Sequence, residues 1–136
     1  MSTQIFVNLP VKNLDKTVKF FTALGFTFNP KFTNENATCM IIGENIFAML
    51  LVESFFESFT AKEICDTSKS TEVIICLSRE SRADVDVIVK NALSAGGKAP
   101  RPSQDHGFMY QHGFEDIDGH TWEVVYMDPV TAESQS

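Results

Sequence analysis

The chain has 136 residues and a formal net charge of −7, from 18 acidic and 11 basic residues. Its length predicts one compact domain over residues 1–136, and a content of 43% hydrophobic residues, with twelve phenylalanines, is sufficient for an apolar core. Because clustered lysines and arginines supply most phosphate binding, and none cluster here, the charge argues against nucleic acid and anionic membrane surfaces as partners.

The first residues lack the basic region and long apolar run of a secretion signal, and the longest apolar run, residues 46–52, is too short to cross a bilayer. We therefore expect a cytoplasmic protein. The three cysteines, Cys39, Cys65 and Cys76, are odd in number and lack metal-site spacing. Because a free cysteine packs as a small hydrophobic residue, we expect buried free thiols.

The first part of the chain predicts a strand, a helix and three further strands, forming a module of about residues 1–53. Asn13 is a suitable N-cap for the helix, whose apolar residues recur at helical spacing until Gly25 ends it. Alternating apolar residues predict the four strands at residues 4–11, 27–33, 37–42 and 46–52.

A polar and aromatic connector, residues 54–70, follows. Its aromatic side chains, Phe55, Phe56 and Phe59, would be costly to leave in water. We expect the connector to fold over a pocket or into an interface, and a simply packed connector is the alternative.

The same order of elements then returns in a second module of about residues 71–128, followed by a tail at 129–136. Ser81 can cap its helix, and Gly96-Gly97 can end it. Strands are expected at residues 71–78 and 107–114 and after His120, with a short segment at 98–101. A repeat of about 65 residues predicts an α+β architecture in which two modules pair to bury a common core.

Glu123 lies within the most strongly patterned strand. The turn Asp118-Gly119 precedes this strand. Side chains alternate along a strand, so Trp122, Val124 and Tyr126 point to one face, and Glu123 points to the other. We expect the Trp122 side to pack on a helix and Glu123 to face the opposite, concave side. The carboxylate is then either a solvated strand residue or a metal ligand or general base in a pocket.

Two stretches carry a resemblance to a known family: FVNLPVKNLDKTVKFF from Phe6 with Leu24-Gly-Phe26, and FEDIDGHTWE from Phe114 to Glu123. They resemble the vicinal oxygen chelate superfamily, which includes glyoxalase I, extradiol dioxygenases, fosfomycin-modifying enzymes and bleomycin-resistance proteins. The resemblance implies two βαβββ modules that form curved mixed sheets around a central cavity. It also implies a divalent metal, typically held by one residue from each of four strands.

The four ligand positions implied by the resemblance fall on Phe6, near Leu50, at or beside Ile74, and on Glu123. Only Glu123 can bind a metal ion, whereas catalytic sites commonly supply about three protein ligands. We therefore expect no metal cofactor. A divalent site built from His106 or His112 with Glu123 is a less favoured alternative.

The resulting hypothesis is a metal-free small-molecule-binding protein, in the manner of the antibiotic-sequestering members of the superfamily. The alternatives are a glyoxalase-like lyase or a dioxygenase that uses Glu123 as general base or metal ligand, and a purely structural interaction module. We also expect a homodimer. A cavity could instead be filled by its own side chains. The candidate ligand-binding residues combine apolar walls with polar anchors: Phe6, Asn8, Leu50, Ile74, Tyr110, His112 and Glu123.

Overall fold

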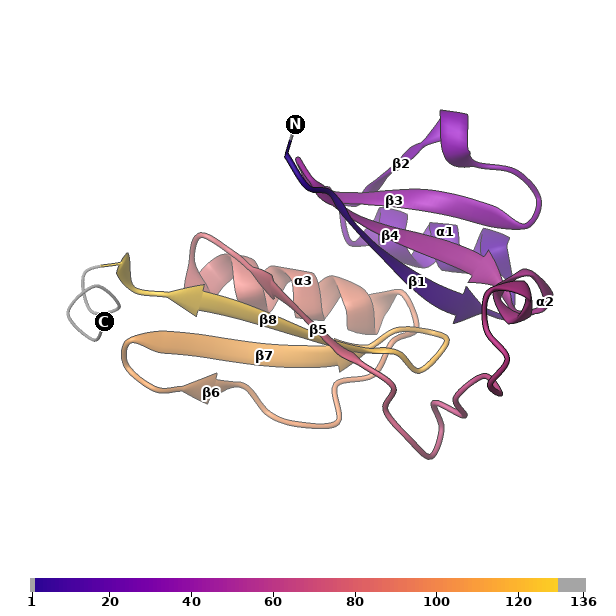
Figure 1. Cartoon of the computed structure of the whole chain (residues 1–136). Helices are drawn as coiled ribbons and strands as arrows, with labels where there is room; N and C mark the ends of the chain where they lie inside the picture. The colour runs from indigo at the N-terminus through magenta and orange to yellow at the C-terminus, as the bar shows by residue number, and fades with distance from the viewer. Residues whose placement is uncertain (1, 130–136) are drawn as a thin grey trace. The chain divides into compact units, whose positions relative to one another are not determined.

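The computed structural model describes residues 2–129, so the predicted tail lies outside the described residues except for residue 129. The chain divides into two compact units after Cys65. Each unit holds a four-stranded mixed sheet and one long helix, and both repeat the order strand, helix, three strands (Figure 1). The predicted α+β fold of two βαβββ modules is therefore confirmed.

The first unit contains β1 (Ile5–Val11), α1 (Leu14–Ala23), β2 (Thr27–Asn29), η1 (Pro30–Phe32), β3 (Ala37–Gly43) and β4 (Ile46–Val52). The strand order is β1-β4-β3-β2, with β1 parallel to β4 and the other pairs antiparallel. Asn13 caps α1 by accepting a hydrogen bond from the backbone of Lys16. β2 is shorter than predicted because Pro30 begins a 3-10 turn whose first residues are capped by Asn29.

The connector begins with α2 (Glu53–Phe56) and η2 (Glu57–Phe59), and α2 packs against β1 and β4. Phe55 and Phe59 meet edge to face with ring centroids 5.2 Å apart. Phe59 nevertheless leaves 67% of its surface exposed. The connector is therefore partly packed on the first unit, and it also presents an aromatic surface.

The second unit contains β5 (Ile74–Ser78), α3 (Arg82–Ser94), β6 (Gln104–Asp105), β7 (Met109–Glu115) and β8 (Thr121–Met127). The strand order is β5-β8-β7-β6, with β5 parallel to β8. Ser81 caps α3 through the backbone of Asp84. The segment predicted at 98–101 makes one bridge, from Lys98 to Glu115, and remains irregular otherwise.

The turn between β7 and β8 is tied to the segment that leads into β5. The hydroxyl of Thr67 donates to the carbonyl of Asp118 at 2.5 Å, and Nδ1 of the buried His120 lies 2.6 Å from Oε1 of Glu72. The carboxylate of Asp116, also buried, accepts from the indole of Trp122 at 2.9 Å. These contacts fix the start of β8, and with it the position of Glu123.

No helix among residues 2–129 is both long and apolar enough to span a membrane.

Candidate functional site

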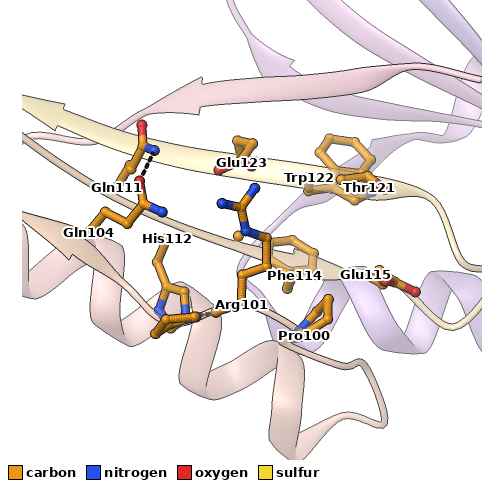
Figure 2. A pocket seen from close by; sticks show the side chains of 12 residues that line it. Pro100, Arg101, Gln104, Gln111, His112, Phe114, Glu115, Thr121, Trp122 and Glu123 are labelled. Carbon is orange, nitrogen blue, oxygen red and sulfur yellow. Dashed lines mark hydrogen bonds between the residues drawn. The ribbon is translucent and has the colours of Figure 1, made fainter. Parts of the chain in front are cut away.

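The second unit contains an open pocket between strands β7 and β8 and the segment formed by residues 100–102 and Gln104 of β6 (Figure 2). Its volume is about 60 Å³. The lining combines prolines and aromatic residues with charged and amide side chains: Pro100, Arg101, Pro102, Gln104, Gln111, His112, Gly113, Phe114, Glu115, Thr121, Trp122 and Glu123.

Glu123 reaches the pocket because of the alternation along β8. Trp122 and Val124 are fully buried on the side of the sheet that packs against α3, so the half-buried Glu123 lies on the opposite side. In the sheet it is paired with Cys76 of β5 and with Gly113 of β7. A Cβ atom on Gly113 would lie 3.2 Å from Oε2 of Glu123 and 2.9 Å from the carbonyl oxygen of Trp122. Glycine therefore leaves room for the carboxylate to lie over β7.

Arg101 supplies the positive charge of the pocket. It stands between Pro100 and Pro102, and Nε2 of His112 lies 3.0 Å from its carbonyl oxygen. In Figure 2 its side chain extends toward the part of β8 that carries Glu123. Within residues 2–129, neither the guanidinium of Arg101 nor the carboxylate of Glu123 forms a hydrogen bond or an ion pair.

Two glutamines add neutral polar groups to the same wall. Nε2 of Gln111 donates to Oε1 of Gln104 at 3.0 Å, and Figure 2 marks this bond. This bond leaves the amide group of Gln104 and the carbonyl oxygen of Gln111 available to a guest. The pocket can therefore offer a guest both signs of charge and both kinds of hydrogen-bonding group.

Cys76 stands opposite Glu123 on β5. The prediction that all three thiols are buried is wrong for this residue, which is exposed, and right for Cys39. Partial burial of the thiol and then the negative charge of Glu123 raise the pKa of Cys76. A raised pKa leaves little thiolate at neutral pH, so Cys76 is a poor nucleophile in this state.

The other candidate residues of the second unit lie on both faces of its sheet. Ile74 is on the same face as Cys76 and Glu123 and is 58% exposed. Tyr110 and His112 are paired with Tyr126 and Val124, and therefore lie on the α3 side. Tyr110 donates there to Asp86 of α3 at 2.6 Å and does not line the pocket, whereas His112 does line it.

In the first unit, Phe6 and Asn8 share one face of β1, and Leu50 points the opposite way. Phe6 is 47% exposed and stacks on Phe47 with ring centroids 5.0 Å apart. Leu50 is paired with Leu9 and is fully buried on the other face. The β4 residue that shares the open face with Asn8 is Met49, its partner in the parallel register.

The side chains present do not fit a divalent metal. Of the four implied positions, only Glu123 carries a donor, and no group of three or more His, Cys, Asp or Glu residues within residues 2–129 could hold an ion. His106 is exposed in the turn before β7, and His112 lies on the α3 side and contacts the backbone of Arg101. The structure therefore does not bring these histidines together with Glu123 in a metal site.

Sequence reasoning missed Arg101, Gln104, Gln111 and Gly113 as site residues. Alternation within residues 107–114 separates Tyr110 and His112 from Gln111 and Gly113, but alternation alone does not tell which set shares a face with Glu123. The pairing of Gly113 with Glu123 is the signal that decides this point. Arg101 lies in an irregular segment and Gln104 begins the two-residue strand β6, so no periodic pattern marks either of them.

Comparisons with known proteins agree with the fold. Residues 3–43 match the family model described as bleomycin resistance protein-like N-terminal. A hypothetical protein from S. aureus has a similar structure, with 26% identity, coverage of 93% of this chain and 95% of that chain, and a TM-score of 0.78. No curated protein sequence matches the chain.

Two further solved structures are similar at 13% identity, which shows the fold alone. One is a glyoxalase/bleomycin resistance protein/dioxygenase family enzyme from Burkholderia phytofirmans, with coverage of 93% and 99% of the two chains and a TM-score of 0.76. The other is the fosfomycin resistance protein FosX from Mesorhizobium loti, with coverage of 98% of both chains and a TM-score of 0.69.

Proposed function

We propose that this protein, which has the fold of the vicinal oxygen chelate superfamily, binds a small organic molecule without the divalent metal that the superfamily typically uses. The resemblance to that superfamily is confirmed by the family-model match and by the shared two-module fold. The observation that carries the proposal is the donor set. Phe6, Leu50 and Ile74 are apolar, and Glu123 is the one metal donor among the four implied positions.

The pocket of the second unit supports binding in place of metal chemistry. Small-molecule sites usually combine apolar walls with a few polar groups that orient the guest, and this pocket has both. Ile74, on the same sheet face of this unit as Glu123, adds exposed apolar surface. A bound molecule that covered such surface would be stabilised by the hydrophobic effect.

A thermal-shift screen tests the proposal. A ligand that binds only the native state raises the melting temperature, by an amount that grows with its concentration relative to its Kd. The panel should include aromatic compounds together with bleomycin and fosfomycin, because similar structures carry those resistance names. We expect at least one compound to stabilise the protein in a concentration-dependent way. No stabilisation by any of them would contradict the proposal.

The alternative function, a lyase or dioxygenase, draws its support from Glu123 alone. This carboxylate is half-buried and free of protein partners within residues 2–129, so it is available to move a proton. Elemental analysis of protein purified without chelator separates the two functions. Stoichiometric zinc, nickel, manganese or iron would overturn the metal-free assignment. If turnover is found without metal, Glu123→Gln should abolish it.

The proposal includes a cytoplasmic homodimer. None of the three cysteines forms a disulfide and Cys76 is exposed, which suits a reducing compartment. The aromatic surface of the connector offers side chains of the kind enriched at interface cores.

A further inference from the structure

Two opposite charges face the same pocket without a protein partner. Arg101 is exposed and Glu123 is half-buried, so water can hydrate both charges when no guest is bound. Arg101 and Glu123 line one hollow and do not form an ion pair with each other or with any other described residue. A guest that carried both charges could contact the two residues at once.

The main-chain positions of both residues are well fixed. Pro100 and Pro102 restrict the backbone beside Arg101, and His112 contacts its carbonyl. Glu123 is held in a strand paired on both sides, and the missing side chain of Gly113 leaves its carboxylate space over β7. The two charged groups therefore project from supported positions.

The size of the pocket limits what can enter it. One enclosed water requires about 10–15 Å³, so a volume of about 60 Å³ holds a group of about four to five non-hydrogen atoms. A carboxylate joined through one carbon to an ammonium group has this size. The free donor and acceptor of the Gln104–Gln111 pair lie in the same wall and can serve further polar atoms.

We propose that the pocket binds a small zwitterion, specifically the head group of an α-amino acid. Arg101 would bind the carboxylate through two parallel hydrogen bonds, and Glu123 would accept hydrogen bonds from the ammonium group. A side chain on the amino acid would extend out of the open pocket. This inference rests on the proposed binding function and names the class of its ligand.

The test is a nuclear magnetic resonance titration of the full chain in a buffer free of carboxylates and zwitterions. Glycine is the probe, acetate carries only the negative charge, and methylamine carries only the positive charge. We expect glycine to shift backbone amide resonances of residues 101–104, 111–113 and 123 in a saturable way, with a Kd in the millimolar range. Acetate and methylamine should bind about ten-fold more weakly or not at all.

Two variants separate the roles of the charges. Arg101→Gln and Glu123→Gln should each weaken glycine binding about ten-fold or more, because each removes a charge-assisted contact. Lys90→Gln and Glu80→Gln make the same charge changes at exposed positions outside the pocket and should leave binding unchanged. Circular dichroism spectra of the four variants serve as the control for folding.

Each other outcome overturns the inference. Equal binding of glycine and acetate would remove Glu123 from recognition, and unchanged binding by Arg101→Gln would mean that the guanidinium does not contact the guest. If glycine causes no shifts but the aromatic and antibiotic panel stabilises the protein, the zwitterion assignment fails and the proposed function stands. If neither binds, both fail.

Discussion

Cys76 reports on the charge of Glu123, because the two residues are paired across β5 and β8. Partial burial and the Glu123 carboxylate raise the pKa of the thiol. We expect alkylation by iodoacetamide near neutral pH to be slower than for an unperturbed cysteine, and Glu123→Gln to increase the rate. A Cys65→Ser background leaves Cys76 as the accessible thiol, since Cys39 is buried. If Glu80→Gln accelerated the reaction equally, the effect would not come from the neighbouring charge.

Asp116 links stability to pH. Burial raises the pKa of its carboxyl above the unfolded value, so its contribution to stability is fully present below the unfolded pKa and is lost as pH rises through the folded pKa. Asp116→Asn should remove this decline. The unfolding free energy of the wild type minus that of the variant should therefore fall as pH increases above about 4.

The same variant should destabilise the fold. An Asn amide placed near the indole N–H of Trp122 would be a donor facing a donor, at a cost of about 1–3 kcal/mol. Urea unfolding at several pH values measures both effects, with Asp84→Asn, at an exposed position, as the control. A difference that does not change with pH would mean that Asp116 keeps the same charge in the folded and unfolded states throughout this range.

Among single residues, the orientation of Glu123 was predictable, and the other residues that line its pocket were not. The alternation of Trp122 and Val124 against Glu123 is visible in the sequence and holds in the structure. Arg101 could not be predicted as a pocket residue because its segment has no regular secondary structure. The fold of the chain around β7 brings it to the pocket. The free thiol of Cys76 was predicted, but its exposure was not, because a residue on an open sheet face has the same local pattern as one in a core.

The turn between β7 and β8 offers a test at the level of an element. Gly119 has a φ of +82°, and a Cβ atom there would lie 2.5 Å from Oγ1 of Thr67. Gly119→Ala should therefore destabilise the second unit by about 2 kcal/mol or more, through backbone strain combined with a clash. Gly107→Ala is the matched control, since Gly107 has a φ of +84° and open space around it.

Thermal or urea unfolding of the two alanine variants gives the comparison. Gly107→Ala should cost only the backbone strain, about 1 kcal/mol. Equal losses of unfolding free energy in the two variants would mean that Thr67 moves aside at no cost in stability. Its contact with the turn would then not hold the segment that leads into β5.

At the level of elements, the helices were predictable from local signals, and the strand register was not. Asn13 and Ser81 cap α1 and α3 as their positions predicted. The predicted strand at 27–33 is wrong beyond Asn29, because Pro30 starts a 3-10 turn. Leu50 illustrates the register problem. Leu50 and Met49 are adjacent, so their side chains point to opposite faces of the sheet. The sequence does not show which of the two is buried, and the pairing with β1 decides it.

For the molecule as a whole, the internal repeat predicted the two modules correctly, because each repeat carries its own cap, helix and strand signals. The sequence of neither repeat predicts what covers the open face of its sheet. Phe6 in the first unit and Ile74 in the second are both exposed within their own units. Exposed apolar residues of this kind are typical of binding surfaces. Such a surface can be covered by a small-molecule ligand or by a second copy of the chain.

The last prediction concerns that assembly. We expect a homodimer with two-fold symmetry, so light scattering at micromolar concentration should give about twice the chain mass of 15.2 kDa. If the connector lies at the interface, Phe59→Ser should raise the dimer dissociation constant about ten-fold or more, because aromatic residues at interface cores carry much of the binding energy. Phe32→Ser is the matched control, since Phe32 is 61% exposed and Phe59 is 67% exposed. A monomer at that concentration would contradict the dimer, and equal effects of the two variants would place the interface away from Phe59.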